Sequence, residues 1–497
     1  MRIQINPERR LAQASPLLYG HFLEHFHRQV YGGVYDPQSP LANEHGFRSD
    51  VIEALQNIRT PIIRWPGGCF VSSYNWKKGV GENRTPVFDK SWRVEEPNTF
   101  GTDEFVQLCR DIGCEPYICT NAGTGTAEEM SDWVEYCNLP TEGEFAKWRI
   151  RNGHEKPHNV KYWSVGNENY GYWEIGAKGS EEWARLVTES AKMMQHVDPT
   201  TSLTAAALVD MDWNTRLLES CGDRLEWISL HGYWDFHHGK NETAPYTQCM
   251  AYTHDLDAPI RKVQGLLNAM GLEKKIKIAF DEWNLRAWFH PGVHTIQQAV
   301  TKEEYLDPRN GNDDNAIYTM ADAVFSGCFL NMVLRHADIV GMANFAPVIN
   351  TRGAIFTYPG GIVKRTTYHV FDMYVHLMGD EVIDQWVQDV PAYRVCGEQG
   401  EVDVDCIDVV STRRSHDGAV AIALVNKHIS DSQQITLTLD SPRKLTLHTL
   451  CGTSPDDYND VGKETVVPFI NNNGVEQEGL TVRLTLQPHS VNILVAE

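Results

Sequence analysis

The sequence predicts a (β/α)8 TIM barrel followed by a C-terminal all-β sandwich domain. Roughly eight β-prone runs alternate with helical segments from residue 17 onward, which is typical of a parallel sheet with helical crossovers. After about residue 379, short β-prone runs follow one another without long helices, which indicates a sandwich. Polar residues follow many of the early runs. This favours a closed barrel over a doubly wound sheet, where they would gather at one switch point.

The barrel elements are predicted from apolar periodicity. Ser49 or Asp50 suits the start of the first helix, and Gly271 suits the end of a later one. The predicted strands are residues 17–24, 62–65, 116–120, 161–168, 202–209, 227–231, 276–282 and 339–345. The predicted helices are residues 49–58, 102–112, 127–137, 181–197, 259–270 and 315–336.

The C-terminal part is predicted from short strands separated by turn residues. These strands are residues 393–396, 402–410, 419–425, 434–439, 444–450, 480–486 and 491–495. Residues 2–6 alternate apolar and polar side chains, and this strand could join the same domain. We therefore expect an N-terminal strand (1–15) that joins the C-terminal domain, a catalytic barrel (16–378) and a β-sandwich (379–497).

Composition excludes several classes of partner. The formal net charge of −22 disfavours nucleic acid and anionic membranes. The N-terminus has no apolar signal core, and no run approaches the roughly 20 apolar residues of a membrane span. The 11 cysteines include no zinc-type CxxC pair, so we expect reduced thiols. These features predict a cytoplasmic protein without a metal site.

Two stretches place carboxylates at predicted strand ends. Glu168 lies between Asn167 and Asn169 directly after one strand, and Asp281-Glu282 follow the β-prone residues 276–280. Taken alone, Asn167 or Asn169 could equally cap a helix, and Asp281-Glu282 could be solvated loop charges. Together they suggest two carboxylates at one barrel mouth, which is the pair that glycoside hydrolysis requires.

Further polar residues end other strands of the predicted barrel. Carboxylates for chemistry, amides and a phenol for hydroxyl groups, and a cation that keeps one carboxylate ionised would together make a sugar site. His231 on its own could equally be a structural histidine. The strand-end set is Glu24, Arg64, Cys69, Asn167, Glu168, His231, Tyr233, Glu282 and Asn344.

Several longer motifs resemble glycoside hydrolase family 51, the α-L-arabinofuranosidases. They appear in the family's order and span about residues 15–350. They are Tyr19-Gly20-His21-Phe22-Leu23-Glu24-His25, Tyr31-Gly32-Gly33-Val34-Tyr35, Arg64-Trp65-Pro66-Gly67-Gly68, Tyr74-Asn75-Trp76, Gly166-Asn167-Glu168, Ser229-Leu230-His231 and Phe280-Asp281-Glu282-Trp283-Asn284. The C-terminal part matches by architecture more than by motif.

The resemblance implies a role for each matching residue. Glu168 would be the general acid/base and Glu282 the nucleophile of a retaining, exo-acting enzyme. Arg64 and Tyr233 would orient Glu282. The substrate-binding candidates are Glu24, Cys69, Asn167, His231, Tyr233, Trp92 and Trp288, with Asn167 on the 2-hydroxyl group.

The same resemblance implies a substrate and an assembly. The substrate would be an arabinose-containing oligosaccharide, hydrolysed without metal or organic cofactor. The family's members are often hexamers, so we expect a homo-oligomer. The alternatives are another retaining glycosidase on the same barrel, such as an endoglucanase or β-xylosidase, and a catalytically silent sugar-binding protein.

The sequence departs from the family pattern around the sugar site. Cys69 stands where many members have Asn, and Pro347 stands where many have Gln. Both changes remove hydrogen-bonding capacity, which can alter substrate discrimination by orders of magnitude. His27 and Arg28 replace a commoner Leu-Gly pattern, and we expect them to be loop residues unless one reaches the substrate.

Overall fold

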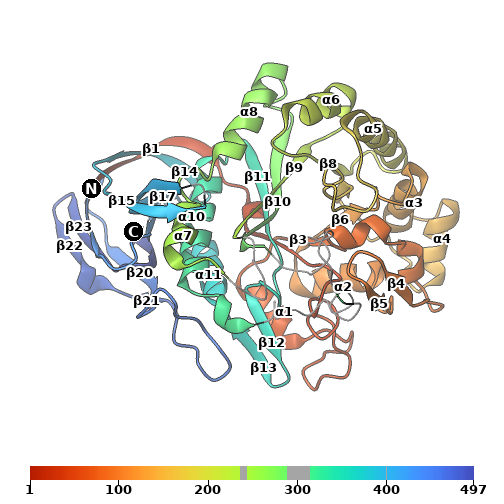
Figure 1. Cartoon of the computed structure of the whole chain (residues 1–497), viewed down its shortest axis with the longest axis horizontal. Coiled ribbons are helices and arrows are strands. Elements are labelled where there is room, and N and C mark those ends of the chain that lie inside the picture. Colours follow the sequence, from red (N-terminus) through yellow and green to blue (C-terminus); the bar gives the residue numbers. More distant parts are fainter. Residues whose placement is uncertain (236–242, 288–300, 302–313, 399) are drawn as a thin grey trace.

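A computed structural model describes residues 1–235, 243–287, 301, 314–398 and 400–497. It contains a barrel and a C-terminal β-sheet domain that lie side by side (Figure 1). Trp288 lies outside the described residues, so its predicted place at the cleft rim stays a prediction.

The barrel is closed by eight parallel strands in the order β10-β11-β2-β3-β6-β7-β8-β9. The predicted (β/α)8 architecture is therefore confirmed. The strands are β2 (Gly20–Phe22), β3 (Ile62–Trp65), β6 (Glu115–Thr120), β7 (Tyr162–Val165), β8 (Ser202–Ala206), β9 (Trp227–Asp235), β10 (Lys277–Arg286) and β11 (Val340–Phe345). Their carboxyl ends meet at one mouth, where barrel enzymes carry their chemistry.

Helices surround the barrel, and most of the predicted ones begin and end within a residue or two of their expected bounds. Helices α4, α6, α7 and α11 were not predicted. The described helices are α1 (Ser49–Asn57), α2 (Thr102–Ile112), α3 (Ala127–Asn138), α4 (Gly143–Arg151), α5 (Ser180–Val197), α6 (Met211–Cys221), α7 (Tyr246–Ala251), α8 (Ala258–Met270), α10 (Met320–Arg335) and α11 (Thr366–Leu377).

Several predicted elements differ in extent. The strands predicted at 161–168 and 202–209 end at Val165 and Ala206, and those predicted at 227–231 and 276–282 continue to Asp235 and Arg286. Two other elements begin differently. The strand predicted at 17–24 begins as a 3-10 helix, Pro16–Tyr19, because Ser15 accepts a hydrogen bond from the Leu17 backbone and proline suits the first helical position. The long helix predicted at 315–336 starts only at Met320. Thr319 caps it, and the Asp322 side chain accepts from the Thr319 backbone N–H.

The C-terminal domain is confirmed as all-β. Ten strands form one continuous sheet in the order β21-β20-β24-β18-β17-β14-β1-β19-β23-β22. Strands from its two halves share one hydrophobic cluster that includes Ile422, Leu494, Leu437 and Val482, so the sheet folds over its own core. Its C-terminal strands are β14 (Glu381–Gln388), β17 (Ile407–Arg413), β18 (Val420–Asn426), β19 (Gln433–Thr438), β20 (Leu445–Cys451), β21 (Phe469–Ile470), β22 (Val475–Glu478), β23 (Thr481–Leu486) and β24 (Ser490–Ala496).

Three small hairpins complete the described strands. The predicted strand 402–410 is divided between β16 and β17, because residue 406 breaks it. The hairpins pair β4 (Val87–Asp89) with β5 (Val94–Glu96), β12 (Ile355–Tyr358) with β13 (Gly361–Lys364), and β15 (Ala392–Gly397) with β16 (Gly400–Asp405).

The N-terminal strand β1 (Arg2–Gln13) lies inside the C-terminal sheet. It pairs antiparallel with β14 and parallel with β19. Ile3 and Ile5 point into the domain core, whereas Gln4 and Asn6 are exposed. The two ends of the chain therefore belong to one sheet (Figure 1).

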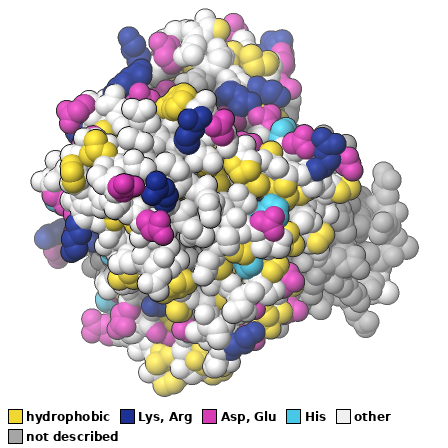
Figure 2. Space-filling view, turned by 90° about the vertical axis from the view of Figure 1, so that its left-hand side faces the viewer, with side chains coloured by type: hydrophobic (Ala, Val, Ile, Leu, Met, Phe, Trp, Pro, Cys, Tyr) yellow, Lys and Arg dark blue, Asp and Glu magenta, His cyan; other side chains and the backbone are white. Residues whose placement is uncertain are grey.

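The surface carries charged side chains of both signs. On the face that carries the C-terminal sheet, hydrophobic side chains form separate groups among charged ones (Figure 2). All 11 cysteines are free thiols. Within the described ranges, no helix combines the length and the apolar character needed to cross a bilayer.

Candidate active site

A cavity of about 510 Å³ opens at the carboxyl ends of the barrel strands. It brings together eight residues that the sequence proposed from separate stretches: Glu24, Cys69, Trp92, Asn167, Glu168, His231, Tyr233 and Glu282. Two of the other proposed residues do not line it. Arg64 lies buried beneath it, and the buried Asn344 donates to the His21 backbone carbonyl instead.

Arg64 on β3 links three strands beneath the cavity. Its Nη1 donates to Glu282 Oε1 at 2.6 Å, and its Nη2 donates to Asn167 Oδ1 at 2.9 Å. Its Nε lies 3.3 Å from Asp281 Oδ2. A buried guanidinium requires such partners, because desolvating an unpaired charge is costly. Arg64 therefore fixes the side chains that follow β7 with respect to those on β10.

Glu282 has both carboxylate oxygens held in place. Arg64 contacts Oε1, and the Tyr233 hydroxyl donates to Oε2 at 2.7 Å. Burial and the charge of Glu282 raise the pKa of Tyr233 well above its usual range, so the phenol remains a donor. The two contacts fix the orientation of the carboxyl group that lines the cavity.

Glu168 lies directly after β7 with a left-handed backbone (φ 43°). This conformation is uncommon for a residue with a side chain and is often found at functional sites. Its Oε1 lies 2.7 Å from His231 Nδ1, and Trp173 Nε1 donates to its Oε2 at 2.7 Å. One oxygen of Glu168, one nitrogen of His231 and one oxygen of Glu282 all lie within 4.8 Å of one another.

His231 and Glu168 form an ion pair in the free enzyme. Burial alone would lower the pKa of His231, but the charge of Glu282 and hydrogen bonds with Asp281 and Glu168 raise it to about 10. Burial opposes ionisation of Glu168, but the hydrogen bond and charge of His231 lower its pKa overall. The shared proton therefore lies on the imidazole.

Asp281 supports this pair from below. Its Oδ2 accepts from the Tyr117 hydroxyl at 2.8 Å, and its Oδ1 accepts from Ser229 Oγ at 2.5 Å. Burial opposes ionisation, but the charges of Arg64 and His231 lower the pKa of Asp281 to about 2. A fixed negative charge thus faces the His231 ring at 3.4 Å and helps to keep it protonated.

Glu24 lies against the Pro-Gly-Gly turn after β3. A Cβ added at Gly67 would lie 2.5 Å from Glu24 Cγ, so only glycine leaves room for this carboxyl group. Glu24 Oε1 accepts from the Phe70 backbone at 3.1 Å and from Trp92 Nε1 at 3.0 Å. Burial and the nearby Glu282 raise the pKa of Glu24 to about 8, so the carboxyl group is largely protonated at pH 7.

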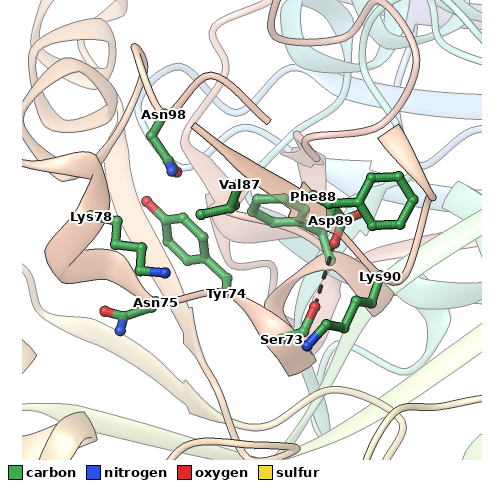
Figure 3. A pocket seen from close by; sticks show the side chains of 10 residues that line it. Ser73, Tyr74, Asn75, Lys78, Val87, Phe88, Asp89, Lys90 and Asn98 are labelled. Carbon is green, nitrogen blue, oxygen red and sulfur yellow. Dashed lines mark hydrogen bonds between the residues drawn. The ribbon is translucent and has the colours of Figure 1, made fainter. Parts of the chain in front are cut away.

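The β4–β5 hairpin presents Trp92 to the cavity. Asp89 accepts from the Trp92 backbone at 2.6 Å and from the Ser91 backbone at 3.2 Å. Figure 3 shows Ser73 pointing toward Asp89 across a small second pocket, and the two side chains are hydrogen-bonded at 3.4 Å. Asp89 thus fixes the turn that holds the indole on Glu24.

Glu174 is a site residue that the sequence analysis did not propose. It is buried, and it accepts from Ser72 Oγ and from Asn167 Nδ2 at 3.4 Å. Burial and the charge of Glu168 raise its pKa to about 8. Atoms of Cys69, Glu168 and Glu174 lie within 4.8 Å of one another. No periodic or strand-end pattern marks Glu174, because it lies in an irregular segment six residues beyond Glu168.

Arg352 and Trp173 were also missed by the sequence analysis, and Arg352 is the charged one of the two. It lines the cavity from the segment after β11, beside the cis peptide bond between Ala346 and Pro347. His27 and Arg28 are not among the described residues that line the cavity. Arg28 donates to the Thr357 carbonyl at 3.1 Å, which agrees with the expected loop role.

This geometry defines the class of protein. Two carboxyl groups on different strands of a (β/α)8 barrel face each other across a cavity lined by tryptophans, tyrosines and hydrogen-bonding groups. One has a neighbouring proton donor, and the other accepts hydrogen bonds from Arg64 and Tyr233. Such a pair is the machinery of a glycoside hydrolase.

Comparisons with known proteins narrow this class. Residues 54–255 match the family described as "Alpha-L-arabinofuranosidase 1 domain", and residues 281–490 match "Alpha-L-arabinofuranosidase C-terminal domain". The chain is 34% identical to alpha-L-arabinofuranosidase C of Emericella nidulans, over 93% of this chain and 92% of that protein. It is 32% identical to an intracellular exo-alpha-(1->5)-L-arabinofuranosidase of Halalkalibacterium halodurans, over 96% and 95%.

Solved structures agree with the sequence matches. The arabinose complex of the Thermotoga maritima alpha-L-arabinofuranosidase superposes with a TM-score of 0.87 at 32% identity, with 99% of each chain covered. A glucanase-xylanase from a metagenome library shares the fold alone, at 12% identity and a TM-score of 0.61. The chain belongs to glycoside hydrolase family 51, the α-L-arabinofuranosidases.

Proposed function

We propose that the protein is a retaining, exo-acting α-L-arabinofuranosidase that releases terminal arabinofuranosyl residues from arabinose-containing oligosaccharides. The observation that carries the mechanism is the proximity of Glu168 and Glu282, whose oxygens approach within 4.8 Å. Retaining enzymes hold their carboxyl groups about 5–5.5 Å apart, whereas inverting enzymes leave about 6.5–9.5 Å for a water molecule. Oxygens this close leave little room for a water molecule between the two carboxyl groups, which supports double displacement.

In the first step, Glu282 attacks the anomeric carbon, and the leaving oxygen receives a proton. Arg64 and Tyr233 hold both oxygens of the nucleophile, so it is aligned before substrate binds. Glu168 is ionised in the free enzyme, and the 2.7 Å hydrogen bond from His231 Nδ1 provides the route by which it gains the proton. Glu168 then passes this proton to the leaving oxygen.

In the second step, Glu168 acts as the base that activates water. Water attacks the glycosyl ester on Glu282, and the released proton returns to the Glu168–His231 pair. Asn167 has its Oδ1 engaged by Arg64, which turns its amide nitrogen toward Glu174 and the cavity wall. We assign this N–H group to the sugar 2-hydroxyl, where a hydrogen bond strengthens as positive charge develops on the ring.

The setting of the reaction is part of the proposal. The names of the relatives support exo action on arabinofuranosyl linkages inside the cell. We propose that this enzyme likewise acts in the cytoplasm, on oligosaccharides rather than on intact polymer. We also propose a homo-oligomer, which light scattering of the purified protein would test.

The decisive experiment combines a substrate panel with two active-site variants. The wild-type enzyme should hydrolyse an aryl α-L-arabinofuranoside, and NMR should show the α anomer as the first product. Glu282→Ala should lower kcat at least about a thousandfold with the fold intact. An inverted first product, or full activity in this variant, would overturn the mechanism.

The panel also separates the alternatives. Hydrolysis of an aryl β-xyloside or of a glucan, without hydrolysis of the arabinofuranoside, would favour a different retaining glycosidase on this barrel. Sugar binding without any hydrolysis would indicate a binding protein. Glu168→Ala provides the complementary test. It should retain activity best toward substrates with acidic leaving groups, which need no proton in the first step.

A further inference from the structure

Arg352 is a buried cation whose hydrogen bonds within the protein are incomplete. Only 6% of the residue is exposed. Its Nε donates to the Ala346 carbonyl at 3.2 Å, and its Nη2 lies 3.5 Å from the Tyr233 hydroxyl. Its Nη1 is buried and has no hydrogen-bond partner among the described residues. An unsatisfied buried donor of a charged group is costly, so a ligand that accepts from it would be favoured.

Other buried arginines of the chain show what full pairing looks like. Arg286 contacts Asp235 and Asp322, and Arg149 donates to the carbonyls of residues 136, 139 and 140. By contrast, no carboxylate oxygen of the described residues lies within 4 Å of the Arg352 guanidinium. Arg352 is thus a buried arginine with two hydrogen bonds, one of them at 3.5 Å, and with no carboxylate beside it among the described residues.

The position of Arg352 is inside the catalytic cavity. It lines the same wall as Tyr233 and Glu282, and its guanidinium carbon lies 4.7 Å from the centre of the Tyr233 ring. Its charge is one of the influences on Glu24, where it opposes the larger effects of burial and Glu282 on the pKa. A group bound near Glu24 and Glu282 would therefore lie close to the Arg352 guanidinium.

The backbone beside the Arg352 guanidinium supplies no hydrogen-bond donor at Pro347. The Ala346 carbonyl that accepts from Nε immediately precedes Pro347, which has no side-chain hydrogen-bonding group and no backbone N–H. The guanidinium lies against this peptide, so it occupies the region where Pro347 supplies no donor. Arg352 itself is placed by Asn284, whose Nδ2 donates to the Arg352 carbonyl at 2.9 Å.

We propose that Arg352 is a substrate-binding residue whose guanidinium donates to a hydroxyl oxygen of the sugar in the cavity, and that it replaces the hydrogen-bonding capacity absent at Pro347. This assignment rests on the proposed function and adds a specificity determinant to it. A substrate without an oxygen at this point leaves the donor unpaired and is discriminated against.

The test separates binding from catalysis. In Arg352→Leu, KM for an aryl α-L-arabinofuranoside should rise about 10- to 100-fold, the effect of losing one hydrogen bond from a charged donor, with kcat within about threefold of wild type. In Arg352→Gln, which retains an N–H donor, KM should lie between the values for the wild type and for Arg352→Leu. The affinity for free L-arabinose, measured by calorimetry, should fall in parallel.

Matched controls keep the result interpretable. Arg149→Gln alters an equally buried arginine far from the cavity and should leave KM unchanged, whatever its effect on the melting temperature. If Arg352→Leu does not fold, Arg352→Lys retains the charge without the planar fork and should still raise KM.

Three results would contradict the assignment of Arg352. An unchanged KM in Arg352→Leu would show that Arg352 does not bind the sugar. A loss confined to kcat, with a shifted pH profile, would show that Arg352 acts only through Tyr233. Stronger inhibition of the wild type by D-glucuronate than by L-arabinose would show that Arg352 binds a carboxylate group and not a hydroxyl group. Absence of wild-type arabinofuranoside hydrolysis would instead remove the proposed function itself.

Discussion

At the scale of single residues, each carboxyl group in the cavity is set by its own neighbours. Arg64 and Tyr233 both donate to Glu282, whereas His231 holds a proton beside Glu168. Neither Glu24 nor Glu174 forms a salt bridge with a cation of the described residues, and burial raises the pKa of each to about 8. Near neutral pH the site therefore contains both ionised and protonated carboxyl groups, so one cavity can offer a nucleophile and several hydrogen-bond donors.

The His231–Glu168 pair leads to a pH prediction. The pKa of His231 is raised to about 10, so the pair keeps its proton up to that pH. In His231→Asn, Glu168 must hold the proton alone, without the imidazole that carries it in the wild type. The alkaline limb of kcat/KM should therefore move to lower pH, with a loss of about 100-fold at pH 9. The measurement is the pH dependence of arabinofuranoside hydrolysis for both proteins.

A surface histidine provides the control for this experiment. His416 is exposed in the C-terminal domain, so His416→Asn should leave the pH profile unchanged. An unaltered alkaline limb in His231→Asn would mean that the proton of the first step does not come from this pair.

At the scale of elements, the β4–β5 hairpin is the structure that completes the sugar pocket. It lies outside the barrel strands, and Asp89 ties its turn to the segment after β3 through Ser73 (Figure 3). From this turn Trp92 donates to Glu24 at 3.0 Å. The hairpin thus contributes the Trp92 indole to one wall of the cavity at the barrel mouth.

Loosening the hairpin should weaken substrate binding more than catalysis. In Asp89→Ala the Trp92 and Ser91 backbone N–H groups lose their acceptor, at a cost in stability of about 1–2 kcal/mol. Trp92 should then lose its fixed contact with Glu24, and KM should rise about 10-fold with a smaller change in kcat. Steady-state kinetics and a melting curve test both parts.

The neighbouring Lys90 supplies the matched control. Its side chain is exposed on the same turn, so Lys90→Ala should change neither KM nor the melting temperature appreciably. Equal KM values for Asp89→Ala and the wild type would show that Trp92 is held in place by other contacts.

At the scale of the whole molecule, the first strand joins the two ends of the chain. Strand β1 lies between β14 and β19, so residues from both termini share the core of the C-terminal sheet. We propose that residues 1–15 and 379–497 fold as one unit beside the barrel at 16–378. Such an arrangement would make the stability of the C-terminal domain depend on the first few residues.

Truncating one side chain of β1 tests this dependence. Ile5 is 4% exposed, so Ile5→Ala should destabilise the domain by about 2–4 kcal/mol and lower the first melting transition by a few degrees. Gln4 points to solvent from the same strand, so Gln4→Ala should have almost no effect. Arabinofuranoside hydrolysis at 25 °C should be unchanged in both. Equal melting curves would contradict the shared unit.

The sequence alone determined the fold class and most of the cavity. Alternation of β-prone and helical segments specifies a barrel, because each strand must bury both faces and each helix one face. Polar residues that directly follow strands converge at the mouth by topology alone, which is why Glu24, Asn167, Glu168, His231, Tyr233 and Glu282 could be proposed together. Helix α4 and helix α6 escaped prediction because their apolar faces are short and interrupted.

Only the tertiary structure decided the contributions of Glu174 and Arg352. Both lie in irregular segments, where no periodicity relates sequence position to direction in space. Their roles depend on contacts with residues far away in the chain: Glu174 with Ser72, and Arg352 with Tyr233. The sequence shows that Cys69 and Pro347 lack the hydrogen-bonding groups common in the family. It does not show which other residues could supply such groups, because that depends on how the side chains pack around the cavity.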